Sequence, residues 1–244
     1  MPTVDLLFQG FPGWSPTHGR LGWPSVALIR ADGTNLLLDT GHMGMHRLLL
    51  GRLAEMGVPA ESIDLLVLSH SHWDHSLGTP LFPGAQIVIG ETELRWAVGL
   101  RPAENPSVPV YLMQHLADHP RLRTVRGDTD LLPGVAAIDP PGHTPGHISL
   151  VVATEEGRVV LAQDAVKNRG EFLARRADQT MDPAASSASI ERIATLANTV
   201  IPGHDRAFRV AGNRAVYQGE LRAEILAKTS PYAEEETLFT ITLR

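Results

Sequence analysis

Four potential metal ligands lie within six residues, directly after an apolar segment, and this cluster constrains the fold more than any other feature of the chain. The mostly apolar segment Ser62–Leu68 predicts a buried strand, and it is followed by His70, His72, Asp74 and His75. An alternating His-x-His at a strand end points both rings to one side. The turn that follows carries the next two ligands to the other side. Neutral imidazole and carboxylate are the usual protein ligands of zinc and related metals. The spacing therefore indicates two adjacent metal positions rather than a polar surface turn with incidental histidines.

Three further segments place potential ligands after turns or strand ends. The sequence PGHTPGH carries His143 and His147, and the sequence PGHD carries His204. Asp164 closes an apolar strand expected at Val159–Gln163. A lone histidine after a turn is usually structural, so each signal is weak alone, but together with the first cluster they indicate one composite site. The other histidines expected at the surface or in loops are His42, His46, His115 and His119.

Apolar runs separated by turn residues predict a layered α/β or α+β domain. Strands are expected at Val4–Phe8, Val26–Arg30, Asn35–Asp39, Ile148–Ala153 and Val159–Gln163. Helices are expected at Met45–Met56, Ala188–Asn198 and Val216–Lys228. Two strand–turn–strand units each end in an aspartate, Asp39 and Asp164, which fits either a duplicated unit or chance repetition in a hairpin-rich chain.

Composition narrows the class of protein. The chain has no cysteine, which excludes a disulfide framework, a cysteine-ligated zinc finger, an iron–sulfur cluster and a cysteine nucleophile. Its 244 residues contain no linker or low-complexity stretch, so a single domain is expected over residues 1–244.

Charge and hydropathy limit the partners. Lys and Arg number 21 against 27 Asp and Glu, giving a formal charge of −6, whereas nucleic-acid binders usually carry a basic excess. A nucleic acid partner is therefore disfavoured, although a small basic patch keeps it open. The N-terminus is a poor signal peptide, and no apolar run approaches the roughly 18 residues of a membrane span. We expect a cytoplasmic protein without membrane contact. The sequence leaves the oligomeric state open, and a homodimer is compatible with it.

The motifs, taken in chain order, resemble the metallo-β-lactamase superfamily of metal-dependent hydrolases. They are Asp39-Thr40-Gly41, the His-x-His-x-Asp-His cluster at residues 70–75, His147, Asp164 and His204. The resemblance implies an α+β fold, a four-layer αβ/βα sandwich with the site at one edge of its two sheets. Within the superfamily, the stretches 81–85 and 202–210 resemble those of animal metallo-β-lactamase domain-containing proteins. Glyoxalase II and the acyl-homoserine lactonases resemble the chain in their aspartate bridge.

The resemblance also implies a role for each candidate ligand. The implied ligands of a first ion are His70, His72 and His147. Those of a second ion are Asp74, His75 and His204, with Asp164 bridging the two. Asp39 and His143 match positions that orient ligand imidazoles, and for His143 a hydrogen bond that stabilises its loop is equally expected.

Two divalent cations are thus the expected cofactors, zinc first, with iron or manganese as alternatives. Such a pair activates water for attack on a carbonyl carbon or a phosphorus. Asp74 and Asp164 are the expected catalytic residues, and Asp164 passes a proton to the leaving group. The expected substrate is a small ester-like carbonyl compound, a lactone or a thioester. A metal-dependent phosphodiesterase or ribonuclease of the same fold is the alternative, and an iron-dependent oxidoreductase is a more distant one.

Two segments are candidates for the substrate pocket. Trp14 and Trp23 lie in a loop rich in proline and glycine, which in this superfamily overhangs the metals; packing against the sandwich is the equal alternative. Lys167 stands where the lactonases carry a tyrosine, so the chain departs from their pattern. The basic segment 167–176 is expected to be mainly a solvated helix face, with binding of an anionic substrate group as the alternative.

Overall fold

Two β-sheets face each other in the computed structural model, which describes residues 1–228, 230, 232 and 236–243. The six-stranded sheet has the order β1 (Thr3–Phe8), β4 (Val26–Ala31), β5 (Thr34–Leu38), β6 (Leu65–Val67), β7 (Gln86–Gly90) and β8 (Leu122–Val125). The seven-stranded sheet has the order β15 (Arg214–Tyr217), β14 (Phe208–Ala211), β13 (Thr199–Pro202), β12 (Gly157–Gln163), β11 (Ser149–Thr154), β10 (Val135–Ile138) and β9 (Thr129–Leu132).

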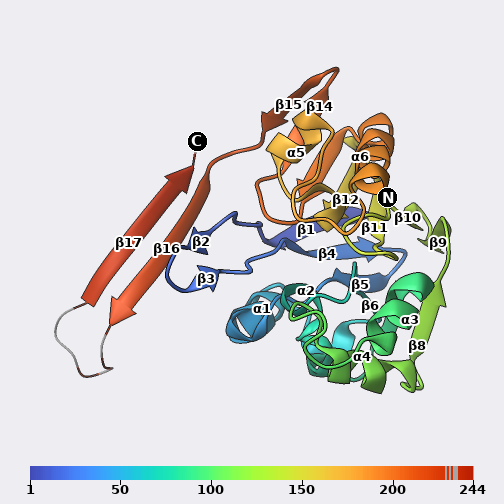
Figure 1. Ribbon diagram of the computed structural model, residues 1–244, viewed down its shortest axis with the longest axis horizontal. Coiled ribbons are helices and arrows are strands. Elements are labelled where there is room, and N and C mark those ends of the chain that lie inside the picture. Colours follow the sequence, from blue (N-terminus) through green and yellow to red (C-terminus); the bar gives the residue numbers. More distant parts are fainter. Residues whose placement is uncertain (229, 231, 233–235, 244) are drawn as a thin grey trace.

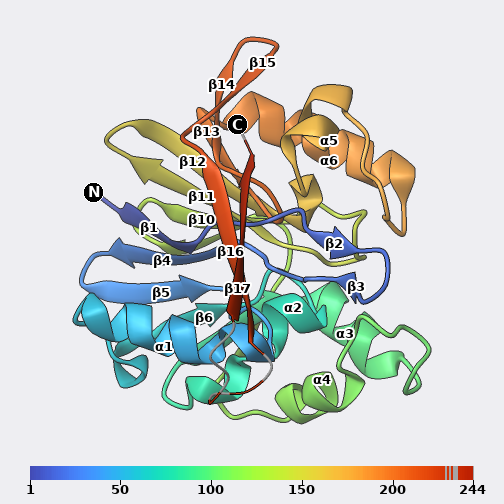
Figure 2. The same cartoon turned by 90° about the vertical axis from the view of Figure 1, so that its left-hand side faces the viewer.

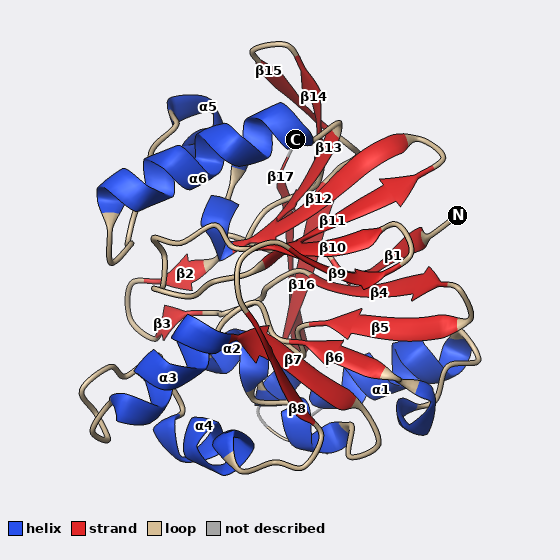
Figure 3. Ribbon diagram, turned by 90° about the vertical axis from the view of Figure 1, so that its right-hand side faces the viewer, coloured by secondary structure: helices blue, strands red, loops and turns tan. Residues whose placement is uncertain are grey.

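Helices cover the outer face of each sheet, as Figures 1 and 3 show. Those on the six-stranded sheet are α1 (His46–Glu55), α2 (Trp73–Ser76), α3 (Glu91–Gly99) and α4 (Val110–Ala117). Those on the seven-stranded sheet are α5 (Arg169–Ala174) and α6 (Pro183–Leu196). Short 3-10 turns lie at Met43–Met45, Ala60–Ser62, Thr79–Leu81 and Asp164–Val166. The predicted four-layer αβ/βα sandwich is confirmed.

Alternating apolar side chains fill the layers on both sides of each central strand. In β4, Val26 and Leu28 pack toward the helices, whereas Ala27 and Ile29 pack between the two sheets. This follows from the strand period of two, which sends successive side chains to opposite faces. A third cluster, around Phe172, joins the seven-stranded sheet to α5 and α6. An unbroken apolar strand therefore reports burial on both faces.

The topology brings the ends of four strands to one edge of the sandwich. Both expected strand–turn–strand units form antiparallel hairpins, β4 with β5 and β11 with β12. β5 then pairs in parallel with β6, and β12 pairs in parallel with β13. Parallel neighbours end at the same edge, so Asp39, His70, Asp164 and His204, which follow these strands, gather there. Ser69 accepts a hydrogen bond from Ile148 N (2.8 Å) and so links the two sheets at this edge.

The C-terminal segment corrects one prediction. The expected helix Val216–Lys228 is instead the end of β15 followed by β16 (Leu221–Lys228), which pairs with β17 (Glu236–Leu243). α3 and α4 were not predicted. The loop before β4 contains a small ladder, β2 (Trp14–Ser15) with β3 (Gly19–Arg20). Among the described residues, no helix has the length and apolar character needed to cross a membrane.

Candidate metal centre

The predicted ligand cluster occupies the turn between β6 and α2. Ser69, His70 and Ser71 are buried, and α2 begins directly after His72 and carries Asp74 and His75. The ring centroids of His70 and His75 are 4.2 Å apart, and those of His70 and His72 are 4.6 Å apart, so His70 lies between the other two rings. The separation into two sides that the spacing predicts does not hold for His75.

Potential ligand atoms come together in three overlapping groups. Within each group the nearest donor atoms all lie within 4.8 Å of one another. The groups are His70, His72 and His143; His70, His75 and Asp164; and Asp74, His75 and His204. Seven side chains from both sheets therefore converge on one small volume.

Asp164 lies at the centre of this cluster. Its Oδ1 is 3.4 Å from both His75 Nε2 and His204 Nε2, and its Oδ2 is 3.2 Å from His143 Nε2. Gly203 lets the backbone pass close to this carboxylate, because a Cβ on residue 203 would lie 2.1 Å from Asp164 Oδ1. The glycine before His204 is therefore required for the approach of β13 to the carboxylate.

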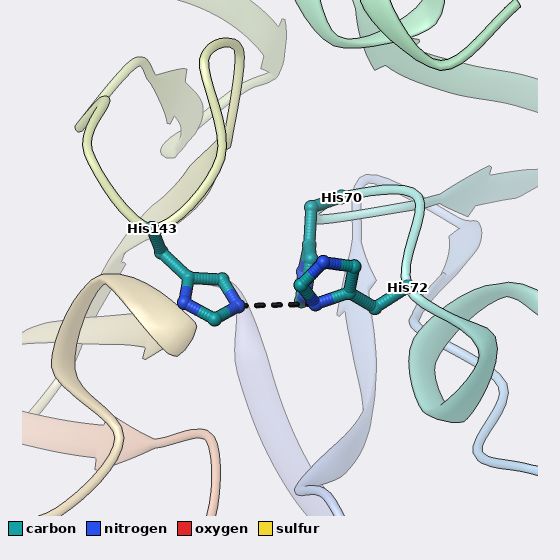
Figure 4. A group of neighbouring side chains, drawn as sticks. All are labelled: His70, His72 and His143. Atoms are coloured by element: carbon teal, nitrogen blue, oxygen red, sulfur yellow. Dashed lines mark hydrogen bonds between the residues drawn. The ribbon is translucent and has the colours of Figure 1, made fainter. Parts of the chain in front are cut away.

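His143 and His147 both reach the cluster from the loop between β10 and β11. His143 Nε2 lies 3.1 Å from His72 Nδ1, and Figure 4 shows its ring pointing at His72 and His70 from the opposite loop. Its Nδ1 lies 3.2 Å from the carbonyl oxygen of Gln179, so both ring nitrogens of His143 have partners. The His147 ring centroid is 5.1 Å from that of His70, and both buried ring nitrogens of His147 lack a hydrogen-bond partner among the described residues.

A hydrogen-bond network beneath the cluster centres on Asp39, which has a positive φ of 58°. Asp39 Oδ1 accepts from Ser69 N (2.7 Å), and Oδ2 accepts from Ser69 Oγ (2.7 Å) and Gln163 Nε2 (2.5 Å). Asp39 Oδ2 also lies 2.7 Å from His75 Nδ1. A carboxylate that accepts from one ring nitrogen fixes the tautomer and leaves the other nitrogen as a ligand. His75 Nε2 therefore faces Asp164.

A second buried carboxylate, Glu93 on α3, connects two ligand loops that the sequence analysis did not link. Glu93 Oε1 accepts from Ser71 N (2.9 Å) and Ser71 Oγ (2.6 Å), and Oε2 accepts from Gly146 N (3.2 Å). Burial raises the pKa of Glu93, while its hydrogen bonds to Ser71 oppose that rise. Because α3 was not predicted, no sequence signal placed this residue at the site.

Burial keeps four histidines of the site neutral. It lowers the pKa of His72 to about 4 and that of His147 to about 3. It also lowers the pKa values of His70 and His143 well below the ordinary value. Neutral imidazole is the form that binds metal ions, so these rings are competent ligands at neutral pH.

The pKa values of Asp164 and His75 shift toward the charged forms in spite of burial. Burial opposes ionisation of Asp164, but nearby histidines, His204 first, hold the pKa of its carboxyl well below its usual range. Burial likewise opposes protonation of His75, but three carboxylates, Asp39 first, raise its pKa well above its usual value. A metal ion on His75 would therefore displace a proton from this ring.

Several buried atoms of the cluster have no hydrogen-bond partner in the described chain. They are Nε2 of His70 and His75, both ring nitrogens of His147, and Oδ1 of Asp164. An unsatisfied buried polar group costs about 1–3 kcal/mol. Imidazole nitrogens and carboxylate oxygens are the donor set of zinc sites. The residues present therefore fit divalent metal ions.

A cavity of about 500 Å³ opens onto the cluster. Its lining combines His72, Asp74, His143, Asp164 and His204 with apolar side chains that include Phe11, Trp14, Trp73 and Met181. Trp14 is largely exposed and reaches the cavity, whereas Trp23 packs on Phe11, with ring centroids 5.4 Å apart. Trp14 thus fits the alternative of a pocket residue, and Trp23 fits the alternative of a packing residue.

The expectation that the basic segment 167–176 is mainly a solvated helix face is wrong for Lys167. Its residue is 8% exposed, and its Nζ lies 3.0 Å from Glu171 Oε1 and donates to the carbonyl of Asp178. Lys167 also lines the cavity. The 3-10 turn at Asp164–Val166 keeps the chain inside the molecule, so Lys167 precedes α5 rather than lying on its exposed face.

Two of the histidines expected at the surface or in loops flank the 3-10 turn Met43–Met45, with His42 before it and His46 at the start of α1. His42 and His46 are half-buried, and the Nε2 atom of each is buried with no hydrogen-bond partner among the described residues. Burial lowers both pKa values. The His42 ring contacts Trp73, with centroids 5.5 Å apart. The expectation holds for His115, which is exposed on α4.

The comparisons with known proteins agree with this geometry. The family model of the metallo-beta-lactamase superfamily matches residues 21–204. Metallo-beta-lactamase domain-containing protein 1 of Homo sapiens is 34% identical over 214 residues, which cover 85% of this chain and 73% of that protein.

Two lactone-cleaving proteins are also similar. An N-acyl homoserine lactonase of Bacillus thuringiensis is 29% identical over 158 residues, which cover 63% of this chain and 60% of that protein. The crystal structure of a quorum-quenching N-acyl homoserine lactone hydrolase superposes with a TM-score of 0.63 at 25% identity, over 75% of this chain and 80% of that one. The match of the family model and of the human relative shows that this chain belongs to the metallo-β-lactamase superfamily.

Proposed function

We propose that this protein is a metal-dependent hydrolase of a small ester-like carbonyl compound, a lactone or a thioester. The observation that carries the proposal is the convergence of seven His and Asp side chains on a cavity of about 500 Å³. The similarity to N-acyl homoserine lactonases supports an ester-like substrate.

We assign the ligands to two divalent ions, zinc first. The first ion would take His70, His72 and His147; the second would take Asp74, His75 and His204; Asp164 would be shared between them. Two ions are proposed because seven ligands exceed the four of a tetrahedral zinc site. His147 is favoured over His143 as a ligand because both of its buried ring nitrogens lack a partner among the described residues, whereas His143 already contacts His72 and the carbonyl of Gln179.

The bound ions would supply Lewis-acid activation of a water molecule and of the substrate oxygen. The protein's own groups do the rest. Asp39 holds His75 by Nδ1 and so keeps Nε2 directed at Asp164. The Asp164 carboxylate would receive the proton that the attacking water loses as its oxygen bonds to the carbonyl carbon, and would pass it to the leaving oxygen or sulfur as the ester or thioester bond breaks. Asp74 also lines the cavity and is the second catalytic carboxylate of the proposal.

The cavity supports a compact, partly apolar substrate. Phe11, Trp14 and Trp73 offer apolar surface, and Lys167 offers an N–H donor close to the cluster. Because Glu171 already neutralises that ammonium, Lys167 suits a carbonyl or single carboxylate oxygen better than a polyanion. Polyanion binding normally rests on many Lys and Arg contacts.

The test compares hydrolysis rates of the zinc-loaded protein on a lactone, a thioester and single-stranded RNA. Asp164→Ala is expected to lower the carbonyl hydrolysis rate at least about 100-fold, since loss of even an indirect partner of a metal ligand costs about 10–100-fold. Asp118→Ala, at an exposed carboxylate, is the matched control and is expected to keep full activity.

Two results would contradict the proposal. Metal-dependent RNA cleavage that Asp164→Ala loses, with no carbonyl hydrolysis, would assign a nuclease instead. Failure to bind any metal after metal-supplemented expression would remove the basis for hydrolysis of either kind.

A further inference from the structure

The two C-terminal strands form an arm that packs chiefly against itself. β16 and β17 pair over their full lengths; Figure 1 shows this hairpin standing off one side of the sandwich, and in Figure 2 it lies in front of the two sheets. Arg206 anchors the base of the arm, because its Nη1 donates to the carbonyls of Gly219 (3.2 Å) and Leu243 (2.9 Å). A two-stranded ribbon is only marginally stable in water. The arm therefore needs another surface to pair with or pack on.

One face of the arm is apolar and the other is charge-balanced. The register places on one face Leu221, Ala223, Ile225, Ala227, Thr237, Phe239, Ile241 and Leu243. The opposite face carries two ion pairs, Arg222 with Glu224 and Lys228 with Glu236. The two described strands thus have no net charge, on a chain whose formal charge is −6. Two copies of the arm would therefore approach each other without net charge repulsion.

The two strands of the arm differ in the charge of the residues along them. β16 carries Arg222, Glu224 and Lys228, and such charges discourage pairing at an edge. Residues 237–243 of β17 contain no charged residue, no proline and no glycine, and are rich in β-branched and aromatic side chains. Figure 1 shows β17 on the side of the arm away from the sandwich, and its Leu238 and Phe239 are more than half exposed. β17 therefore presents an edge suited to a partner strand.

We propose that β17 pairs antiparallel with β17 of a second copy of this chain, centred on Thr240. In this register Thr240 faces its own counterpart, and Phe239 faces Ile241 of the second copy. Aromatic and β-branched residues are favourable cross-strand neighbours. A two-fold axis through Thr240 keeps the alternation of both strands in phase, so the apolar faces of the two arms join into one face of a four-stranded sheet. The partner is a second copy because residues 237–243 match their own alternation in this register and carry no charge that would repel the second copy.

The first test measures molar mass by light scattering across a concentration series. The unmodified protein is expected at twice the 26.4 kDa chain mass. Thr240→Lys places two like charges face to face on the axis and is expected to return the mass to that of a single chain. Leu226→Lys adds the same charge to an exposed position of β16 and is expected to leave the dimer intact. Circular dichroism checks that both variants fold.

The second test uses the absence of native cysteine. Oxidised Thr240→Cys is expected to give a disulfide-linked dimer, because directly opposed residues have the Cβ spacing that a disulfide needs. Thr237→Cys is the control, since its counterpart lies six residues along the paired strand, roughly 20 Å away. A monomeric wild-type protein, a dimer that Thr240→Lys leaves intact, or equal cross-linking of the two cysteine variants would each overturn the proposal.

Discussion

Each side chain of the metal centre is held by residues from distant parts of the chain. Asp39, at the end of β5, contacts Ser69 and His75 after β6 and Gln163 at the end of β12. Such outer contacts fix ring orientation and tautomer before any ligand arrives. The centre is therefore preorganised by the same strand ends that define the fold.

His143 and His147 differ in whether their ring nitrogens are free to bind a metal ion. We expect His147→Ala to bind about one zinc fewer per chain, because it removes two buried ring nitrogens that have no partner among the described residues. His143→Ala is expected to keep two, because the ring nitrogens of His143 already contact His72 and the carbonyl of Gln179. Elemental analysis of the purified variants measures this, with circular dichroism as the check on folding. The reverse order of zinc loss would place His143 in the ligand set instead.

The lowered pKa of His72 predicts an acid-sensitive step in the metal-free protein. Burial lowers this pKa from 6.5 to about 4. Between pH 6.5 and about 4, His72 therefore binds a proton in the unfolded chain but not in the folded chain. The free energy of unfolding falls as the pH decreases through this window. The full window corresponds to about 3 kcal/mol, of which about 2 kcal/mol is lost between pH 7 and pH 5. Urea midpoints of chelator-treated wild type and His72→Gln, measured at pH 7 and pH 5, give the difference. Equal losses of stability in both proteins would contradict the assignment.

At the scale of elements, α3 connects the two ligand loops through Glu93. Its carboxylate accepts hydrogen bonds from Ser71 in one loop and from Gly146 in the other. A Cβ on Gly146 would lie 2.0 Å from Glu93 N, so the loop and the helix backbone are in direct contact. The spacing of the ligand loops is thus set by a helix that carries no ligand itself.

Removing this carboxylate tests the connection. Glu93→Ala is expected to lower the free energy of unfolding by roughly 2–4 kcal/mol, because it leaves buried donors of Ser71 and Gly146 unsatisfied at about 1–3 kcal/mol each. Thr92→Ala, at the exposed neighbouring position of the same helix, is expected to change it by less than about 0.5 kcal/mol. Urea unfolding of the two metal-free variants makes the comparison, and similar stabilities would show that α3 does not hold the loops.

At the scale of the whole molecule, the sequence predicts the central strands of the two sheets better than the C-terminal strands outside them. The runs Val26–Arg30 and Val159–Gln163 are apolar on both faces, so they predict buried central strands, and ligands that follow strand ends predict a site at an edge. The segment Leu221–Lys228 misleads because it is rich in helix-forming residues, and only cross-strand pairing with β17 makes it a strand. The burial of Lys167 depends on a carboxylate partner four residues away, Glu171, which the basic composition of the segment does not reveal.

Metal removal is expected to destabilise the whole sandwich, because the ligands come from both sheets. His70 and His75 follow β6 of one sheet, whereas Asp164 and His204 follow β12 and β13 of the other. Ions that bind only the folded arrangement add their binding free energy to stability, about 2.7 kcal/mol for one site at a hundredfold excess over the dissociation constant. For a chain of this size that corresponds to a rise in Tm of roughly 5–10 °C. Differential scanning calorimetry of chelated and zinc-reloaded protein measures the rise, and Asp164→Ala, which lacks the proposed bridge between the sites, is expected to show a smaller one. An unchanged Tm on reloading the wild-type protein, or an equal rise in the variant, would show that the two sheets are not joined through the cluster.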